Sequence, residues 1–235
     1  MTLDLTSRDR CYVIAEAGTN HAHAGWAGRY ARALEYAEAA ARAGADAVKF
    51  QIFDEPFDLF CRIEGDDRRE ARWRQTVMRT WDWLRVKDFA ESLGIDFLAS
   101  VFQYRTVEWL KQLNVKATKV ASRAAEKFPY EDATGDILVS NGMFRGMIPV
   151  PEGHDIVVLQ CESKYPSDLP WEGELPGYSC HSPTPDLAID AIKRGCKLVE
   201  VHFYIDPSHA GRDLPASLTL DGLRKICAAR DSQCP

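Results

Sequence analysis

The sequence lacks a basic surplus, a long apolar run and a paired cysteine motif. Its 29 Lys and Arg residues stand against 35 Asp and Glu residues, a net charge of −6, so no general basic surface invites nucleic acid or acidic lipid. Its apolar runs are no longer than a strand, and residues 1–11 show no charged-then-apolar signal pattern. We therefore expect a soluble, cytoplasmic protein without a nucleic-acid or membrane partner.

Cysteine is present, but not in a spacing that predicts a zinc site or a thiol relay. The seven residues are irregularly spaced and no CxxC pair occurs among them. We expect free and mostly buried thiols. The seven are Cys11, Cys61, Cys161, Cys180, Cys196, Cys227 and Cys234.

The remaining composition, with 46% apolar and 27% charged residues, is that of one globular domain spanning residues 1–235. Strand-sized apolar runs alternate with helical stretches, a pattern typical of βα units in a parallel sheet. The helices are expected over residues 28–42, 106–113 and 185–195, and over one long charged segment that includes Trp73, Val77, Leu84 and Phe89. The eight predicted strands cover residues 11–15, 43–51, 96–100, 116–122, 136–140, 155–161, 176–182 and 197–203.

Eight strands in this order predict an α/β fold, a compact (β/α)8 TIM barrel, although such barrels usually take about 250 residues. Residues 141–155 and 167–176 are rich in Gly and Pro and lack a helical period. The helices after strands five and six are therefore expected to be shortened or missing. That flank must be covered by loops, by the N-terminal segment or by another subunit, which favours a homodimer or larger oligomer.

Polar residues stand at the ends of nearly every predicted strand, where a parallel barrel builds its active site. Residues two apart on a strand point to the same side, so Lys49 and Gln51 share a side, as do Glu200 and His202. The other members of this ring are Glu16, Asn20, Ser100, Lys119, Ser122, Ser140, Ser163, Tyr165, Ser179 and His181. A barrel would bring them together as candidate catalytic and substrate-binding groups.

Three kinds of chemistry are open to this ring. Lys49 and Lys119, with several hydroxyls, would provide donors for a phosphate, although a single strand-end lysine is often structural. His181 and His202 end neighbouring strands and could share a divalent metal ion, or could be two histidines that only hydrogen-bond at the mouth. Glu16 could act as an acid or a base.

Two further charged features each have a functional and a structural interpretation. Asp213, after the last strand, could bind substrate hydroxyls or the metal, or could cap the following turn. The run of charges at residues 66–74 is interpreted as a solvated helix start in preference to an anion site.

Taken in order, the segments YVIAEAGTNHAHAG, AGADAVKFQ, TKVAS, ILVSNGM, LQCESKYP, GYSCHS, VEVHF and GRDLPASL resemble the sialic acid synthase family, which includes the N-acetylneuraminate, legionaminate and pseudaminate synthases. The resemblance covers residues 11 to about 228. It implies a barrel in which carbon 3 of phosphoenolpyruvate attacks an open-chain sugar aldehyde, water attacks carbon 2, and phosphate leaves. It also implies a divalent metal, usually manganese, with magnesium or cobalt as alternatives.

The resemblance assigns roles to individual positions. His181 and His202 match the two metal ligands, and Ser163 stands where the family often has Asn facing phosphoenolpyruvate. Tyr165, Gln51, Glu16 and Asp213 match positions that contact the acceptor sugar, with Glu16 also a proton-transfer candidate. The positions that would hold phosphoenolpyruvate are Lys49, Ser100, Lys119, Ser122, Ser140 and Ser179.

Departures from the family pattern leave the acceptor open. Full-length members continue into a C-terminal antifreeze-like domain that contacts an N-acetyl group, and this sequence matches the catalytic barrel alone. Arg123 replaces a Gly and could recognise a charged acceptor, while Cys180 replaces an Asp. N-acetylmannosamine, a relative of it or a different aldehyde therefore all stay open. The alternatives to a synthase are a non-catalytic barrel that binds a phosphorylated metabolite or partner protein, and a lyase or aldolase using a lysine Schiff base.

Overall fold

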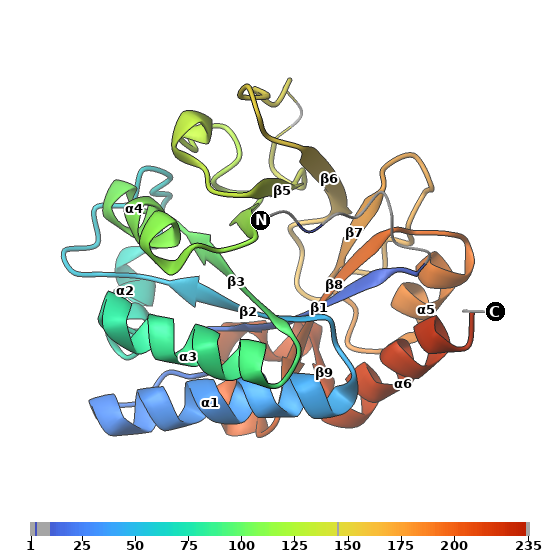
Figure 1. Ribbon diagram of the computed structural model, residues 1–235, viewed down its shortest axis with the longest axis horizontal. Helices are drawn as coiled ribbons and strands as arrows, with labels where there is room; N and C mark the ends of the chain where they lie inside the picture. Colours follow the sequence, from blue (N-terminus) through green and yellow to red (C-terminus); the bar gives the residue numbers. More distant parts are fainter. Residues whose placement is uncertain (1–2, 4–9, 145, 234–235) are drawn as a thin grey trace.

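A closed barrel of eight parallel strands forms the centre of the molecule (Figure 1). The computed structural model describes residues 3, 10–144 and 146–233. Each strand pairs with the next in the chain, and β1 also pairs with β8, which closes the barrel and confirms the predicted fold. The strands are β1 (Tyr12–Gly18), β2 (Ala47–Ile52), β3 (Asp96–Val101), β4 (Ala117–Val120), β5 (Asp136–Ser140), β6 (Ile156–Cys161), β7 (Gly177–Cys180) and β8 (Leu198–Tyr204), and a short β9 (Ser217–Thr219) extends the sheet beside the end of β8.

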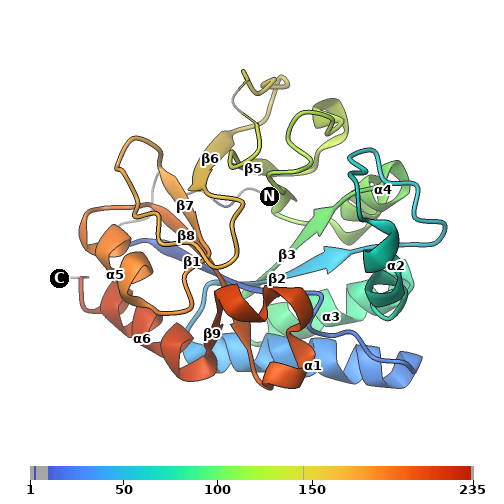
Figure 2. The ribbon, with the colours of Figure 1, turned by 180° about the vertical axis from the view of Figure 1, so that it is seen from behind.

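Helices cover only part of the barrel wall, as Figure 2 shows from behind. The α-helices are α1 (Trp26–Ala43), α2 (Asp67–Arg74), α3 (Thr80–Ser92), α4 (Tyr104–Leu113), α5 (Asp186–Lys193) and α6 (Leu220–Asp231), and the 3₁₀ turns are η1 (Tyr130–Asp132), η2 (Pro207–His209) and η3 (Gly211–Ala216). The prediction of one long charged helix was wrong, because residues 75–79 separate α2 from α3. The backbone amide of Arg79 donates to the Asp82 carboxylate at 3.1 Å, so a new helix begins there.

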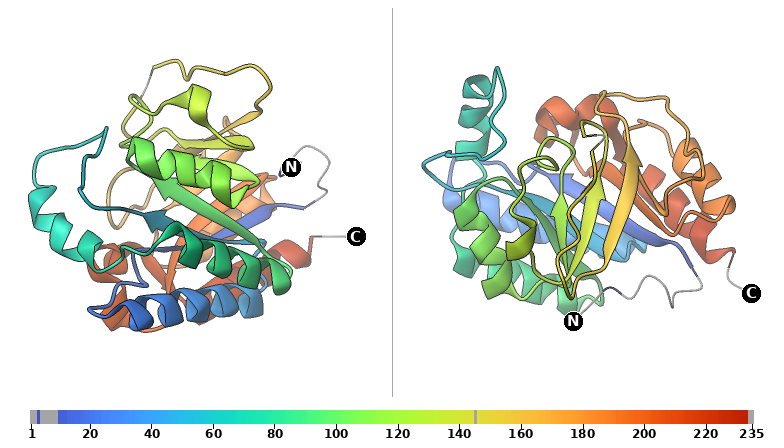
Figure 3. Two further views of the ribbon diagram at one scale, coloured as in Figure 1. Left: turned by 60° about the vertical axis from the view of Figure 1, so that its left-hand side comes forward. Right: turned by 90° about the horizontal axis from the view of Figure 1, so that it is seen from above.

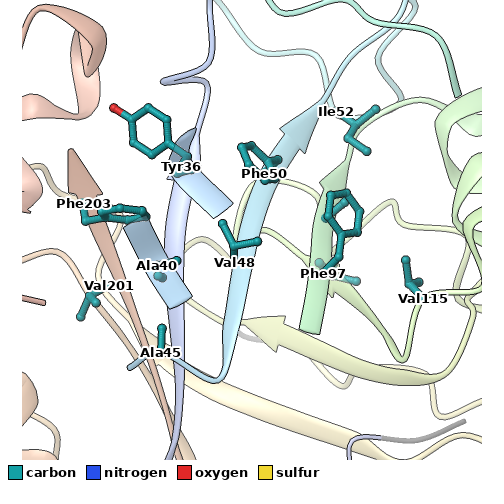
Figure 4. Close-up of a cluster of buried hydrophobic side chains, with 14 of the residues drawn as sticks. Tyr36, Ala40, Ala45, Val48, Phe50, Ile52, Phe97, Val115, Val201 and Phe203 are labelled. Atoms are coloured by element: carbon teal, nitrogen blue, oxygen red, sulfur yellow. The ribbon is translucent and has the colours of Figure 1, made fainter. Parts of the chain in front are cut away.

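The apolar layer between helices and strands is built from the outward-facing strand residues. Tyr36 and Ala40 of α1 lie over this layer beside Val48 of β2 and Phe203 of β8 (Figure 4). The rings of Tyr36 and Phe203 meet edge to face with their centroids 5.3 Å apart. This packing orients the strands whose opposite faces point into the barrel.

Inward-facing residues change from apolar to polar along each strand. Leu98, Leu138 and Leu198 belong to a buried cluster at one level of the barrel interior, and Leu3 packs into the same cluster. Two residues further along the same strands stand Ser100, Ser140 and Glu200. The barrel therefore has an apolar base beneath a polar layer at the carboxyl ends of its strands.

The strands β5 and β6 carry no covering α-helix in either view of Figure 3. In the described part of the chain no α-helix lies between α4 and α5, which confirms the expected losses after β5 and β6. The connection from β4 to β5 has also lost its helix and retains only η1, a difference not predicted. Trp171 in the β6–β7 loop is buried, and its indole donates to the Leu175 carbonyl at 2.9 Å, so a loop covers part of this flank.

Candidate active site

A cavity of about 750 Å³ lies at the carboxyl ends of the strands. It brings together fourteen of the fifteen predicted site residues. These are Glu16, Lys49, Gln51, Ser100, Lys119, Ser122, Arg123, Ser140, Ser163, Tyr165, Ser179, His181, His202 and Asp213. The exception is Asn20, which is buried outside the lining and whose amide donates to the Phe203 carbonyl at 2.9 Å. Asn20 therefore joins the loop after β1 to β8, and the structure does not bring it into the cavity lining with the other predicted residues.

Lys49 is the centre of a buried charge cluster. Its Nζ lies 2.6 Å from Oε2 of Glu16 and 3.6 Å from Oε2 of Glu200, and it donates to the Ser100 hydroxyl at 3.0 Å. The parallel register places Glu16 opposite Lys49, so the contact follows from strand pairing. Because all three charged side chains are almost fully buried, their charges are screened little by water.

Lys119 forms the second half of the cluster. Its Nζ donates to the Ser140 hydroxyl at 2.8 Å and lies 3.8 Å from Oε1 of Glu200. Glu200 in turn accepts from the Ser179 hydroxyl at 3.1 Å, its partner in the register of β7 and β8. Glu200 thus lies between two ammonium groups, and two serine hydroxyls hold the lysines in place.

Burial and neighbouring charge set the protonation of these groups. Burial raises the pKa of Glu16, although Lys49 opposes the rise. For Glu200 burial acts in the same direction, but Lys119 and Lys49 outweigh it and lower the pKa to about 2. Burial lowers the pKa of Lys119, partly offset by Glu200. Glu200 is therefore a fixed negative charge, whereas Glu16 holds a proton more readily than an ordinary carboxylate.

His181 and His202 face each other across the mouth of the barrel, with ring centroids 5.5 Å apart. Nδ1 of His181 lies 2.7 Å from the Glu162 carbonyl oxygen, which can only accept, so Nδ1 carries the hydrogen and Nε2 keeps its lone pair. Burial lowers the pKa of His181 to about 4, which keeps the ring neutral. The ring of Tyr165 stacks on His181 with centroids 4.1 Å apart.

These histidines fit a metal site with two protein ligands. In His181 the lone pair of Nε2 is available, because Nδ1 carries the hydrogen. In His202 the buried Nδ1 has no hydrogen-bond partner in the described chain. No cluster of three or more His, Cys, Asp or Glu suited to a metal ion occurs among the described residues. Oxygen atoms from water or substrate would have to complete the coordination of any ion held there.

A glycine allows a close approach of two serine-bearing loops. The backbone amide of Gly142 donates to the Ser122 hydroxyl at 3.1 Å. A Cβ at position 142 would lie only 2.7 Å from Oγ of Ser163, so a larger residue would displace that hydroxyl. Ser122 also contacts Sγ of Cys161 at 3.4 Å, which places a free thiol in the cavity lining.

Arg123 lines the cavity as predicted from its place after β4, and its guanidinium is also held by protein partners. Its guanidinium makes two hydrogen bonds to the Asp66 carboxylate, one of 3.1 Å and one of 2.5 Å, and it donates to the Cys61 carbonyl at 2.9 Å. The side chain of Asp66 is fully buried. Arg123 therefore attaches the loop after β4 to the start of α2.

The structure also assigns cavity positions that sequence reasoning missed. The sequence predicts Glu200 in the ring beside His202, but it does not indicate that this carboxylate lies between Lys49 and Lys119. The charge run at residues 66–74 is not simply a solvated helix start, because three of its arginines line the cavity together with Arg212. Those three are Arg68, Arg69 and Arg72. The pattern of polar and apolar residues in α2 does not predict which face of the helix points toward the barrel.

Two other expectations concern the chain as a whole. The six described cysteines are free and buried as predicted, and Cys234 lies outside the described residues. Within the described ranges, none of the helices has the length and apolarity to span a bilayer.

Comparison with known proteins places the chain among sugar-acid synthases. It is 28% identical to the N,N'-diacetyllegionaminic acid synthase of Legionella pneumophila over 95% of this chain and 72% of that protein. It is 28% identical to the mouse N-acetylneuraminate-9-phosphate synthase over 88% of this chain and 66% of that protein. The crystal structure of the spore coat polysaccharide biosynthesis protein SpsE of Bacillus subtilis superposes with a TM-score of 0.71 at 26% identity, covering 96% of this chain and 68% of that one.

The chain therefore spans about two thirds of the length of the curated relatives it matches. The model of one family, described as the NeuB family, matches residues 36–232. This match covers most of the sequence and most of the cavity-lining strands, and the chain belongs to the NeuB family.

Proposed function

We propose that this protein condenses phosphoenolpyruvate with a sugar aldehyde to give a 2-keto sugar acid and inorganic phosphate. The observation that carries the proposal is the pair of buried lysines, Lys49 and Lys119, each bound to a serine at the base of a large cavity. Ammonium and hydroxyl donors gathered at the base of a cavity suit a phosphate ligand, because charged donors make the strongest hydrogen bonds to its oxygens. The names of the relatives, which are synthases of sialic-acid-type sugars, support the same activity.

The charge balance of the cluster supports a role for Glu16 in proton transfer. Lys49 and Lys119 face Glu16 and Glu200, so the cluster is neutral before a ligand arrives. A phosphate that enters near the lysines adds negative charge, and the carboxylate with the raised pKa is the one that takes up a proton. Glu16 would then be positioned to return that proton during the reaction.

The proposed reaction forms one carbon–carbon bond and breaks one carbon–oxygen bond. Carbon 3 of phosphoenolpyruvate forms a bond to the aldehyde carbon, whose oxygen takes a proton and becomes a hydroxyl. Water adds to carbon 2, and one of its protons is the one that the aldehyde oxygen gains. The bond from carbon 2 to the phosphate ester oxygen then breaks, and the remaining proton of the carbon 2 hydroxyl passes to the departing phosphate, which leaves the ketone. Lys49 and Lys119 would stabilise the leaving phosphate, because preorganised cations that are buried are screened little by solvent.

His181 and His202 would hold a divalent metal ion, manganese by our proposal, with magnesium and cobalt as alternatives. Such an ion supplies Lewis acidity that polarises the aldehyde oxygen. The residues themselves fix the geometry: the Glu162 carbonyl orients the His181 ring, and Tyr165 restricts it by stacking. Gln51 and Asp213 line the same cavity and would contact the acceptor hydroxyls.

The test is phosphate release from phosphoenolpyruvate with manganese, across a panel of aldoses, N-acetylated hexosamines and small aldehydes, with mass spectrometry of each product. A product heavier than its aldehyde by a pyruvyl unit is expected with at least one acceptor. Lys119→Met should abolish release, while Lys225→Met, on the exposed face of α6, should not. Equal release by both variants would overturn the proposal, and absence of phosphoenolpyruvate binding would favour a non-catalytic barrel.

One observation favours a second candidate. Burial lowers the pKa of Lys119, and a lysine with a lowered pKa is the kind that forms a Schiff base with a carbonyl substrate. A lyase or aldolase of this type would be inactivated by borohydride in the presence of substrate. The proposed condensation forms no imine and should survive the treatment.

A further inference from the structure

Five arginines form the outer part of the cavity, and together they are called here the arginine rim: Arg68, Arg69, Arg72, Arg123 and Arg212. Deeper in the cavity the charges balance, with two lysines against Glu16 and Glu200. At the rim, Asp213 in the lining and Asp66 beneath it are the described carboxylates that accompany the five arginines. A protein of net charge −6 thus concentrates positive charge at one opening.

Contacts of the arginine rim join three separate segments: α2, the loop after β4 and η3. Asp66, at the start of α2, pairs with Arg123 from the loop after β4 and lies 3.8 Å from Arg69. Arg72 of α2 donates to the Thr19 carbonyl at 2.8 Å and also to the His209 carbonyl. The guanidinium of Arg72 lies against Gly211 of η3, since a Cβ built there would be 3.4 Å from its Cζ.

Two members of the rim have no internal partner. Arg68 and Arg212 are exposed and line the cavity, and neither side chain makes a hydrogen bond or ion pair within the described part of the chain. Asp66 neutralises Arg123, and Arg72 is held by backbone carbonyls. Arg68 and Arg212 are therefore the side chains left for a ligand.

We infer that the acceptor carries an anionic group, a phosphate or a carboxylate, at the end remote from its aldehyde, and that Arg68 and Arg212 bind it. This inference rests on the proposed function, in which phosphoenolpyruvate occupies the lysines. For a second anion, the remaining cationic side chains among the described residues of the cavity lining are those of the arginine rim. Guanidinium groups match both oxyanions because their paired donors reach two oxygens at once.

Calorimetry with phosphoenolpyruvate and manganese present tests the inference with three matched probes: mannose, mannose 6-phosphate and mannuronate. The two charged sugars, or one of them, should bind at least about tenfold more tightly than mannose. The stronger of the two identifies the anion as phosphate or carboxylate. Equal binding of all three sugars would overturn the inference.

The double variant Arg68→Gln with Arg212→Gln should remove the tighter binding of the charged sugars relative to mannose. It should leave the affinity for phosphoenolpyruvate unchanged. Both side chains are exposed, so the variant should fold, which circular dichroism checks. Arg224→Gln, an exposed arginine of α6, is the matched control and should retain the advantage. An advantage that survives the double variant, or a larger loss of phosphoenolpyruvate binding than of charged-sugar binding, would overturn the inference.

The same titrations separate failure of the inference from failure of the proposed function. If the wild type binds no phosphoenolpyruvate, the proposed function fails. Binding of mannose 6-phosphate or mannuronate that depends on Arg68 and Arg212 would then still show an anion site at the rim.

Discussion

Replacing Glu200 by Gln removes the negative charge that lies between the two buried lysines while retaining the shape of the side chain. The amide oxygen of Gln can still accept from the Ser179 hydroxyl. Lys49 keeps Glu16 at 2.6 Å, but Lys119 loses the one carboxylate within 4 Å of it among the described residues. An uncompensated buried charge typically costs about 3–5 kcal/mol, so we expect a loss of about 3 kcal/mol in the free energy of unfolding at pH 7.

The loss should depend on pH in a defined direction. The folded-state pKa of Glu200 is lowered to about 2 from 4.5, so its stabilisation is present above the unfolded value and is lost as pH falls through 2. Burial lowers the folded-state pKa of Lys119. Once pH rises through that pKa, the lysine is neutral and the loss of the Glu200 carboxylate no longer leaves a buried charge unpaired. The difference in the free energy of unfolding between wild type and variant should therefore be largest near neutral pH and smaller at low and at high pH.

Urea unfolding followed by tryptophan fluorescence at pH 4, 7 and 9.5 measures this difference. The slope of the free energy against urea should stay the same, since the surface exposed on unfolding does not change. Glu126→Gln, which changes an exposed carboxylate, is the matched control and should lie within about 0.5 kcal/mol of wild type. A Glu200→Gln loss below about 1 kcal/mol, or one that does not change with pH, would refute the reasoning.

Three further predictions follow from the same geometry. His202→Ala should abolish manganese binding, measured by electron paramagnetic resonance, and turnover, while circular dichroism stays unchanged; full turnover with metal would contradict the assignment. Arg123→Gln should lower the free energy of unfolding by about 2–3 kcal/mol in urea, because the buried Asp66 carboxylate loses its two hydrogen bonds from a guanidinium, whereas Arg224→Gln should cost little. The flank of β5 and β6 exposes Met147 and Val150, at 94% and 67%, so light scattering should detect a homodimer or larger oligomer at micromolar concentration, and a monomer would contradict this.

The sequence alone determined the barrel and most of the cavity lining. Alternation with a period of two placed Lys49 with Gln51, and Glu200 with His202, on the inner side of their strands, because successive side chains of a strand point in opposite directions. Closure of a parallel barrel then brings the strand ends into one ring. The Gly and Pro residues of the β5–β6 and β6–β7 loops already indicated the missing helices.

Only the tertiary structure decided which charges meet. Arg123 and Asp66 are 57 positions apart, and no local pattern indicates that they pair. The same contact places α2 at the mouth, so that arginines of a run interpreted as solvated line the cavity. Asn20, by contrast, turns away to bond β8. Helical and strand periods specify the face on which a side chain stands, but the energy of a charge depends on distance and burial, which are set when separate segments pack together.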